Sequence, residues 1–527
     1  MQIFHNAKLY PTADPASRQS AVAIENGRVV ALGSDPDVLN LARPGCQVVN
    51  LGGKTILPGL TDSHIHLSLY AQSLAKVNCE VASRQACLDL IAQKARDLKP
   101  GEWILGHGWN QNVWPEGFGT AADLDAVAPD HPVYLTDKAI HSAWANTAAI
   151  RLAGITAHTP DPSGGIIQRA ENGEPKGIFF ESAMLMIERA IPAFSAEALA
   201  GLLDHAQQTL WQMGLTAAHD FDDLLCFEAL QQLHQRGRLK LRVTKGIPED
   251  ALDTAIAMRL QTGFGDGMLR IGSLKLFSDG ALGPHTAAML EPYSDDPLNY
   301  GVLLGDSQHF YPIFEKAAKN HISIAVHAIG DRANREILDA YARLRDFEAQ
   351  NHLPRRAHRI EHVQTIQPQD QVRLQALGII ASMQPLHATS DMFTADRYWG
   401  SRAENAYVFR SLLDLGARLV FGSDAPVETP NPFAGLHAAV TRRRADGNPG
   451  SQGWHPSQRL TVAQTLQAYT SAPAHIYGRQ SEQGSLLPGS FADLILLEQD
   501  PFEMQPDDLL FLKPSGTMVE GEWVWQT

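Results

Sequence analysis

Cysteines are few in this chain, and long hydrophobic segments are missing. Its 527 residues include 4 cysteines, none of which forms a C-x-x-C pair. Such a sparse set is not typical of a domain held together by disulfides. Because no apolar run is long enough to cross a bilayer, the sequence also excludes a membrane-spanning helix. We therefore expect a folded protein that has no membrane partner.

Basic residues are also in short supply. Lys and Arg number 43 against 58 Asp and Glu, which gives a formal net charge of -15. An acidic protein is repelled by phosphate backbones, so nucleic acid is not an expected partner. The first residues lack the basic and then apolar segment of a secretory signal, which together with the few cysteines predicts a cytoplasmic location. A small molecule is the expected partner, and assembly as a homodimer stays open.

Eight short apolar runs, most of them followed by a segment of helical periodicity, organise most of the chain. They cover residues 55–66, 215–221, 241–246, 271–280, 322–331, 358–363, 378–385 and 417–426. Strands that alternate with helices form parallel sheets, and eight is the number that closes a (β/α)8 barrel. The sequence therefore predicts an α/β fold with a TIM barrel over residues 55–66 and 176–479. A doubly wound open sheet is the alternative.

The two ends of the chain and one long insertion fall outside this rhythm. Residues 1–54 and 480–527 read as short strands and turns that cannot easily bury a core alone, so we expect them to form one small composite β-sandwich. The first two apolar runs lie roughly 150 residues apart, far more than a βα loop needs. This gap predicts an inserted subdomain over residues 67–175.

The insertion carries four of the nine tryptophans, which are Trp103, Trp109, Trp114 and Trp144. A long βα insertion emerges at the mouth of a barrel, where barrel enzymes work. One interpretation is an apolar lid, with Trp109 as the candidate for contact with a substrate. The alternative for each ring is the hydrophobic core of the insertion itself.

Side chains that can bind a metal close several of the apolar runs. His64 and His66 end the first run, and residues i and i+2 of a strand point to the same side. His327, His362 and Asp424 lie at or near the ends of the fifth, sixth and eighth runs. The carboxyl ends of barrel strands gather around one axis, so these side chains are expected to meet. Imidazole and carboxylate ligands suit zinc, with iron, manganese and nickel as alternatives.

Lys275 is an unusual residue because it lies between Leu274 and Leu276 in the fourth run. A buried ammonium group is costly without a partner. One explanation is an ion pair with Asp279 or Asp424. The other is a neutral amine that adds carbon dioxide, which gives an anionic carbamate able to bridge two metal ions. We favour the carbamate because Lys275 faces the predicted ligand set.

A series of motifs, in this order, resembles the amidohydrolase superfamily, specifically the amidohydrolase family 3 group that includes N-substituted formamide deformylase-like proteins. The motifs are PGLTDSHIHL, GHGWNQNVW, HPVYLTDKAIHSAWANTAAI, KLFSDGALG, HAIGDRAN, RIEHVQ, FGSDAPVETPNPF and PGSFADLILLEQDP, and they cover nearly the whole chain. The resemblance implies a distorted barrel with a two-ended β-sandwich and a metal centre at the strand ends. It also implies hydrolysis of carbon–nitrogen bonds other than peptide links.

Carried over position by position, the resemblance implies a binuclear site with one or two divalent ions. His64, His66 and Asp424 would hold one ion, His327 and His362 the other, and carboxylated Lys275 would bridge them. Two positions depart from the family. His285 replaces an arginine that members often carry, which predicts a neutral substrate-binding residue there. Only the His141–Ser142 part of a D-G-H-S motif persists.

The expected chemistry follows from these ligands. A divalent cation makes bound water acidic and polarises a carbonyl group, and Asp424 is the candidate general base that would return the proton to the leaving nitrogen. His141 is a candidate for polarising the substrate, with a structural hydrogen bond as its alternative. Glu361 or Asp331 could orient the imidazoles. A single-metal deaminase or deacylase and a non-catalytic binding or regulatory barrel are the competing functions.

Overall fold

The computed structural model describes residues 1–111, 114–138 and 141–527. The chain divides into two compact units, one made of Met1–Tyr70 with Leu203–Thr527 and the other of Ala71–Leu202. In the described ranges, no helix combines the length and the hydrophobicity that a bilayer crossing requires.

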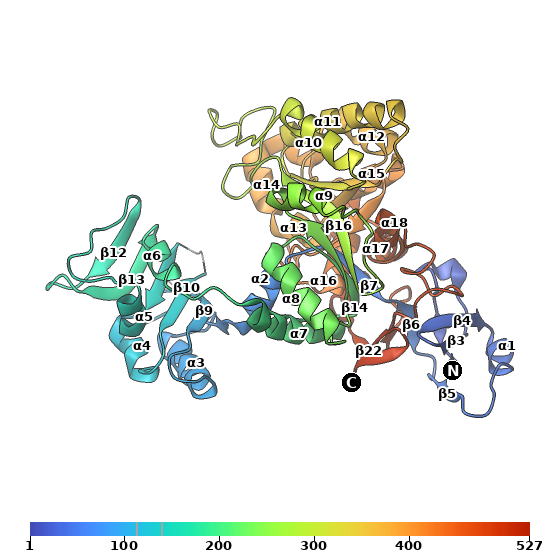
Figure 1. The fold of residues 1–527 in the computed structure, drawn as a ribbon, viewed down its shortest axis with the longest axis horizontal. Helices are drawn as coiled ribbons and strands as arrows, with labels where there is room; N and C mark the ends of the chain where they lie inside the picture. The colour runs from blue at the N-terminus through green and yellow to red at the C-terminus, as the bar shows by residue number, and fades with distance from the viewer. Residues whose placement is uncertain (112–113, 139–140) are drawn as a thin grey trace. The chain divides into compact units, whose positions relative to one another are not determined.

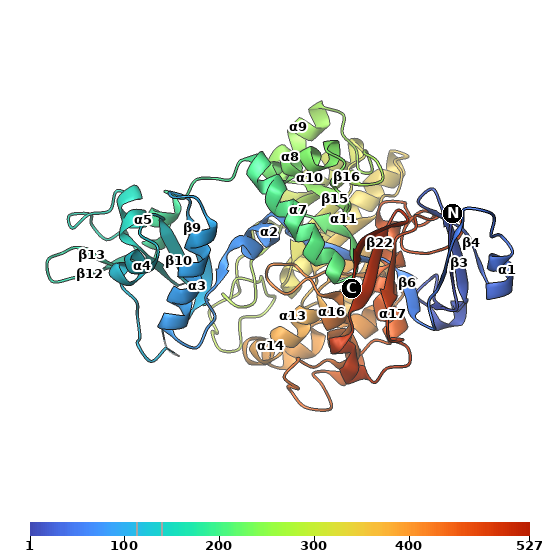
Figure 2. The ribbon, with the colours of Figure 1, turned by 90° about the horizontal axis from the view of Figure 1, so that it is seen from below.

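Eight parallel strands form the central sheet of the first unit, and they follow one another in chain order (Figure 1). They are β7 (Leu60–Ile65), β14 (Leu215–Asp220), β15 (Arg242–Ile247), β16 (Leu269–Phe277), β17 (Ile324–Ala328), β18 (His358–His362), β19 (Ile379–Met383) and β20 (Leu419–Phe421). Helices cover the outside of this sheet, where α7 (Ala196–Gln212) and α8 (Leu224–Gln235) lie side by side, as do α10 (Ser307–Lys319) and α11 (Asp331–Gln350) (Figure 2). The predicted α/β barrel is confirmed.

The sheet is nearly closed. Among the described residues, β20 and β7 share no hydrogen-bonded ladder. Backbone bonds just beyond β20 close the seam instead: Asp424 N donates to His64 O at 2.7 Å, and His66 N donates to Ala425 O at 3.0 Å. The strand ends that carry the predicted ligands therefore face one another across this seam.

Both ends of the chain build the β-sandwich, as predicted. One sheet, in the order β4-β3-β1-β5, contains β1 (Gln2–His5), β3 (Ala21–Glu25), β4 (Arg28–Gly33) and β5 (Gln47–Asn50). The other, in the order β2-β6-β21-β22-β23, contains β2 (Lys8–Leu9), β6 (Thr55–Pro58), β21 (Leu494–Leu497), β22 (Pro514–Val519) and β23 (Glu522–Gln526). The single strand predicted over residues 55–66 is therefore two strands in two sheets. They meet at Gly59, where a Cβ atom would lie 2.2 Å from Thr216 Oγ1.

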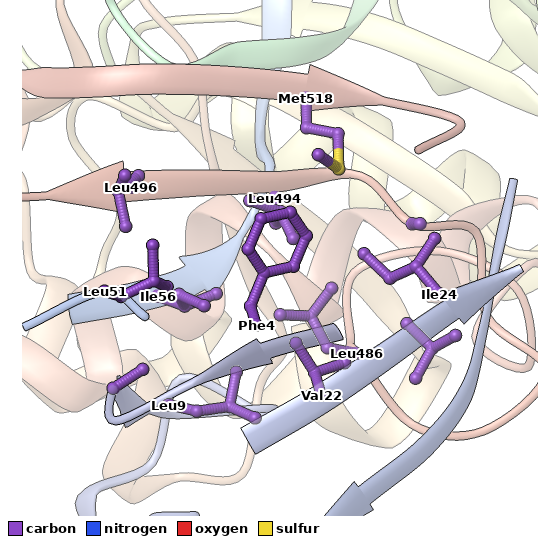
Figure 3. Packing of buried hydrophobic residues seen from close by; sticks show 13 residues of the cluster. Phe4, Leu9, Val22, Ile24, Leu51, Ile56, Leu486, Leu494, Leu496 and Met518 are labelled. Carbon is purple, nitrogen blue, oxygen red and sulfur yellow. The ribbon is translucent and has the colours of Figure 1, made fainter. Parts of the chain in front are cut away.

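The five-stranded sheet has two differently occupied faces because its side chains alternate. Leu494 and Met518 face Phe4 and Ile24 of the other sheet and form a hydrophobic core with them (Figure 3). The neighbouring Thr517 points the opposite way, and its hydroxyl donates to the carbonyl oxygen of Trp211 in α7 at 2.6 Å. One face thus completes the sandwich while the other contacts the barrel.

The second unit holds a six-stranded sheet in the order β12-β13-β11-β10-β9-β8. Its strands are β8 (Val77–Asn78), β9 (Ile104–Trp109), β10 (Val133–Asp137), β11 (Ser142–Ala145), β12 (Gly165–Arg169) and β13 (Pro175–Glu181), with α3 (Arg84–Asp97), α4 (Ala121–Val127), α5 (Thr147–Leu152) and α6 (Met184–Glu188). The sequence predicts an insertion that ends at residue 175, but this compact unit continues to Leu202 because β13 belongs to its sheet.

Candidate metal centre

The predicted ligands come together at the carboxyl ends of the barrel strands. Asp424 Oδ1 lies 3.3 Å from His64 Nε2 and 3.4 Å from His66 Nε2. The ring centroid of His362 lies 4.9 Å from that of His64 and 4.5 Å from that of His327. Five candidate ligands from four segments of the sequence are thus neighbours.

Two of these residues reach the centre through unusual backbone geometry. In β18, alternation would place Glu361 and His362 on opposite faces of the sheet. His362 has a φ of +76°, and Asp424, just past β20, has a φ of +61°. Non-glycine residues rarely adopt this left-handed conformation, and it concentrates at functional sites. The turn at each strand end re-aims the side chain toward the shared centre.

Lys275 lies among the same side chains. It is 3% exposed, and its Nζ is 4.7 Å from the ring centroid of Phe221 and 4.9 Å from that of Phe277. The Phe221 ring in turn contacts His64. Among the described residues, no carboxylate lies within ion-pair distance of Lys275. Asp279, one suggested partner, instead accepts hydrogen bonds from three backbone amides at 2.8–3.0 Å.

His387 is a neighbour of the centre that the sequence patterns do not identify. It lies in α13 (Pro385–Ser390), directly after β19. Its Nε2 is 3.9 Å from Asp424 Oδ2, and its ring stacks on His362 with centroids 6.1 Å apart. His362, His387 and Asp424 form one possible metal-binding group, and His64, His66 and Asp424 form another. The sequence signal that could have identified His387 is its position just beyond a buried apolar strand.

Carboxylate and amide oxygens fix the orientation of three imidazoles through Nδ1. The partners are Glu361 for His64 at 2.6 Å, Asp222 for His66 at 2.9 Å and Gln384 for His362 at 2.9 Å. Each bond leaves Nε2 available, which is the arrangement typical of metal-binding histidines. In His327 the two ring nitrogens exchange these roles. Its Nε2 contacts Gly280 O at 2.9 Å, so Nδ1 is the nitrogen that stays available.

A buried arginine supports the Glu361 carboxylate. Arg359 and Glu361 are both completely buried and are i and i+2 on β18. Arg359 Nη2 donates to Glu361 Oε2 at 2.8 Å and to Ser382 Oγ at 2.6 Å. Glu361 thus orients His64, whereas Asp331, the other suggested partner, bonds Leu290 N and Gln367 Nε2 away from the imidazoles.

Burial controls the protonation of the inward-facing groups. It lowers the pKa of His64 and of His327 to about 4, with the charge of Lys275 acting in the same direction. Burial also lowers the pKa of Lys275 to about 8, although the charges of Glu361 and Asp424 oppose this. The two imidazoles are therefore neutral near pH 7, and part of the Lys275 population is a free amine.

His66 behaves in the opposite way. Burial alone would lower its pKa, but hydrogen bonds to Asp222 and Asp424, together with their charges, raise it to about 9. Burial likewise tends to raise the pKa of Asp424, yet His64 and His66 hold it well below its usual range. Without a metal ion, a protonated His66 faces an ionised Asp424.

The residues fit a divalent cation. His64 Nε2 and His387 Nε2 are buried and have no hydrogen-bond partner within the part of the chain that the structure describes. Buried polar atoms without a partner are rare, and here both belong to imidazoles that can bind a cation. Both nitrogens lie beside the ionised Asp424, and nitrogen and carboxylate donors are those that zinc prefers.

The family's sequence pattern provides the decisive comparison. The amidohydrolase family matches residues 47–525. The chain belongs to the amidohydrolase family. It is 30% identical to YtcJ of Bacillus subtilis, which carries an amidohydrolase assignment, over 99% of each chain. It is also 30% identical to the N-substituted formamide deformylase of Arthrobacter pascens, over 95% of this chain and 94% of that one.

A solved structure extends the comparison to three dimensions. It is an uncharacterized metal-dependent hydrolase from Pyrococcus furiosus, with a TM-score of 0.79 and 28% identity, and the match covers 95% of this chain and 100% of that one. The fold of this amidohydrolase is thus shared with that structure over most of the chain.

Three further predicted site residues of the amidohydrolase have contacts within their own units. The Trp109 ring is completely buried in the insertion's core, and its Nε1 donates to Leu135 O at 2.8 Å. His141, in the same unit, has a 70% exposed side chain whose Nδ1 lies 3.1 Å from Glu181 Oε1. His285 packs on the Tyr398 ring at 3.9 Å and pairs with Asp295 at 3.1 Å.

Proposed function

We propose that this amidohydrolase hydrolyses non-peptide carbon–nitrogen bonds of small molecules with the help of bound divalent metal, and that N-substituted formamides are the first substrate class to test. The observation that carries the proposal is the pair of buried, unpartnered imidazole nitrogens beside the Asp424 carboxylate. The formamide deformylase supports the substrate class, and the Pyrococcus hydrolase supports the metal dependence.

The residues divide into two candidate sets of ligands. His64, His66 and Asp424 would hold one ion, and His327 and His362 a second, with His387 beside Asp424. Zinc is the metal to test first because of the imidazole-rich donors. When bound, such a cation supplies an acidified water and a polarised substrate carbonyl.

We propose that Lys275 is carboxylated, and that its carbamate would be a ligand shared by the two candidate ions. The neutral amine attacks carbon dioxide. A nitrogen–carbon bond forms while one carbon–oxygen π bond opens and leaves its electron pair on oxygen, and the nitrogen then loses a proton to solvent. The lowered pKa of Lys275 provides the free amine, and the described residues offer it no carboxylate at ion-pair distance. The aromatic rings of Phe221 and Phe277 lie close to Nζ and provide it with apolar contacts.

Asp424 is the general base in this proposal. Its low pKa keeps the carboxylate ionised at neutral pH, so it can accept a proton from the attacking water. It then passes that proton to the substrate nitrogen as the carbon–nitrogen bond breaks, which releases an acid and an amine. Glu361, Asp222 and Gln384 hold the imidazoles in place while this occurs.

The test is a panel of N-substituted formamides, simple amides and carbamates with zinc-loaded protein, in which the released acid and amine are identified by mass spectrometry. Asp424→Asn should lower kcat by about a hundredfold or more. Asp331→Asn is the matched control, since Asp331 is also buried but contacts none of the ligands, and it should keep the rate within about threefold. Turnover that Asp424→Asn leaves unchanged would refute the role of Asp424.

Native mass and metal analysis separate this arrangement from its competitors. The bridged site predicts about two ions per chain and about 44 Da of added mass at Lys275. One ion with unmodified Lys275 would favour a single-metal deaminase or deacylase. Bound zinc without turnover of any panel member would favour a non-catalytic binding protein.

A further inference from the structure

The weakest join of the barrel lies next to the candidate metal centre. Seven neighbouring strand pairs have parallel ladders, but among the described residues the pair β20 and β7 has none, and β20 is only three residues long. His64 and His66 lie on one side of this join and Asp424 on the other. Two backbone hydrogen bonds cross this join, from Asp424 N to His64 O and from His66 N to Ala425 O, and a side chain adds to them.

The Asp62 carboxylate spans the join. Asp62 is 1% exposed and lies on β7, two residues before His64. Its Oδ1 accepts hydrogen bonds from His64 N at 3.0 Å and from Ser423 N at 3.1 Å. Its Oδ2 accepts the hydroxyl of Ser423 at 2.5 Å. One side chain is thus bonded to both edges of the barrel.

The Ser423 hydroxyl carries this connection into the turn that bears Asp424. Ser423 Oγ accepts a hydrogen bond from Ala425 N at 3.0 Å, so the residues on both sides of Asp424 are fixed. This matters because Asp424 holds a left-handed backbone conformation that needs outside support. The space is also closed at Gly422, where a Cβ atom would lie 2.4 Å from His64 N.

We propose that Asp62 is a positioning residue that joins β7 to the Gly422–Ala425 turn and thereby sets the distance between the Asp424 carboxylate and the two imidazoles of β7. The part of this inference that concerns metal affinity rests on the proposed function. The carboxylate is suited to the task because it accepts three hydrogen bonds at once, one from β7 and two from the Gly422–Ala425 turn.

Two measurements on full-length Asp62→Asn and Ser423→Ala test the inference, with Asp331→Asn as the matched buried-carboxylate control. The first is hydrogen exchange of residues 60–67 and 419–427 in metal-free protein. Both variants should exchange about tenfold faster or more in these segments, whereas Asp331→Asn should match the wild type. The second is zinc affinity by competition with a chromophoric chelator, which should fall about tenfold or more in both variants only.

Each outcome decides the inference. Unchanged hydrogen exchange in both variants would refute the claim that Asp62 joins β7 to the Gly422–Ala425 turn. Faster exchange with unchanged zinc affinity would refute the positioning role. An equal loss of affinity in Asp331→Asn would reduce Asp62 to a general stabilising residue. If Asp62→Asn does not fold, the same two measurements on Ser423→Ala decide whether the inference holds. A wild type that binds no zinc would refute the proposed function, while hydrogen exchange would still test the join.

Discussion

Zinc binding should weaken about tenfold for each unit that the pH falls between 8 and 6, because one proton must leave His66 before this imidazole can bind the metal. The pKa of His66 in the metal-free protein is about 9, so the ring is protonated throughout this range. His64 and His327, with pKa values of about 4, are already neutral and add nothing to the slope.

The same shift predicts how the metal-free protein responds to pH. The folded pKa of His66 lies above its ordinary value of 6.5, so its contribution to folding stability is fully present below pH 6.5 and is lost as the pH rises through about 9. The difference between these two values corresponds to roughly 3 kcal/mol. Metal-free protein should therefore lose stability toward alkaline pH, where zinc binds best.

Chelator competition at pH 6, 7 and 8 in bicarbonate-free buffer measures the slope, and calorimetry in buffers of different ionisation enthalpy counts the protons released. Bicarbonate is omitted because carbamate formation at Lys275 would release a further proton. Asp222→Asn should flatten the slope, since Asp222 contributes to the raised pKa of His66. A zinc affinity that changes less than about threefold from pH 6 to 8 would refute the reasoning.

Two further predictions concern the supporting residues. Glu361→Gln leaves the buried Arg359 charge without its partner and should lower the free energy of unfolding by about 3–5 kcal/mol in urea titrations. The control Glu25→Gln breaks an ion pair with the exposed Arg43 and should lower it by less than about 1 kcal/mol. Equal losses in the two variants would contradict the role of burial. His387→Asn should weaken zinc binding about tenfold, and His285→Asn should leave it unchanged.

The barrel strands could be predicted because both faces of a parallel sheet are buried, so each strand is a continuous apolar run. Because burial continues from one strand to the next, the sequence does not show where one sheet ends and another begins. The strands on both sides of Gly59 are buried along their whole length, although β6 lies in the sandwich and β7 in the barrel. Only the close approach of Thr216 to Gly59 distinguishes them, and that contact is distant in sequence.

The candidate site shows the same division between local and distant information. His64 and His66 follow from the two-residue repeat of a strand, and His327 from its place near a strand end. His387 lies beyond β19 in the short helix α13, so the path of the chain after the strand, not the repeat of the strand, places its ring near Asp424. His285 likewise lies outside the barrel strands, in a turn that places its ring against Tyr398.

The sheet shared by the two ends of the chain has a consequence for biosynthesis. Strand β6 leads directly into the barrel, but its hydrogen-bonded neighbour β21 begins at Leu494, and the outer strand β23 ends at Gln526. A growing polypeptide therefore cannot finish the layer against which α7 rests until residues 494–526 have left the ribosome. We expect the early strands to need shielding from self-association during translation.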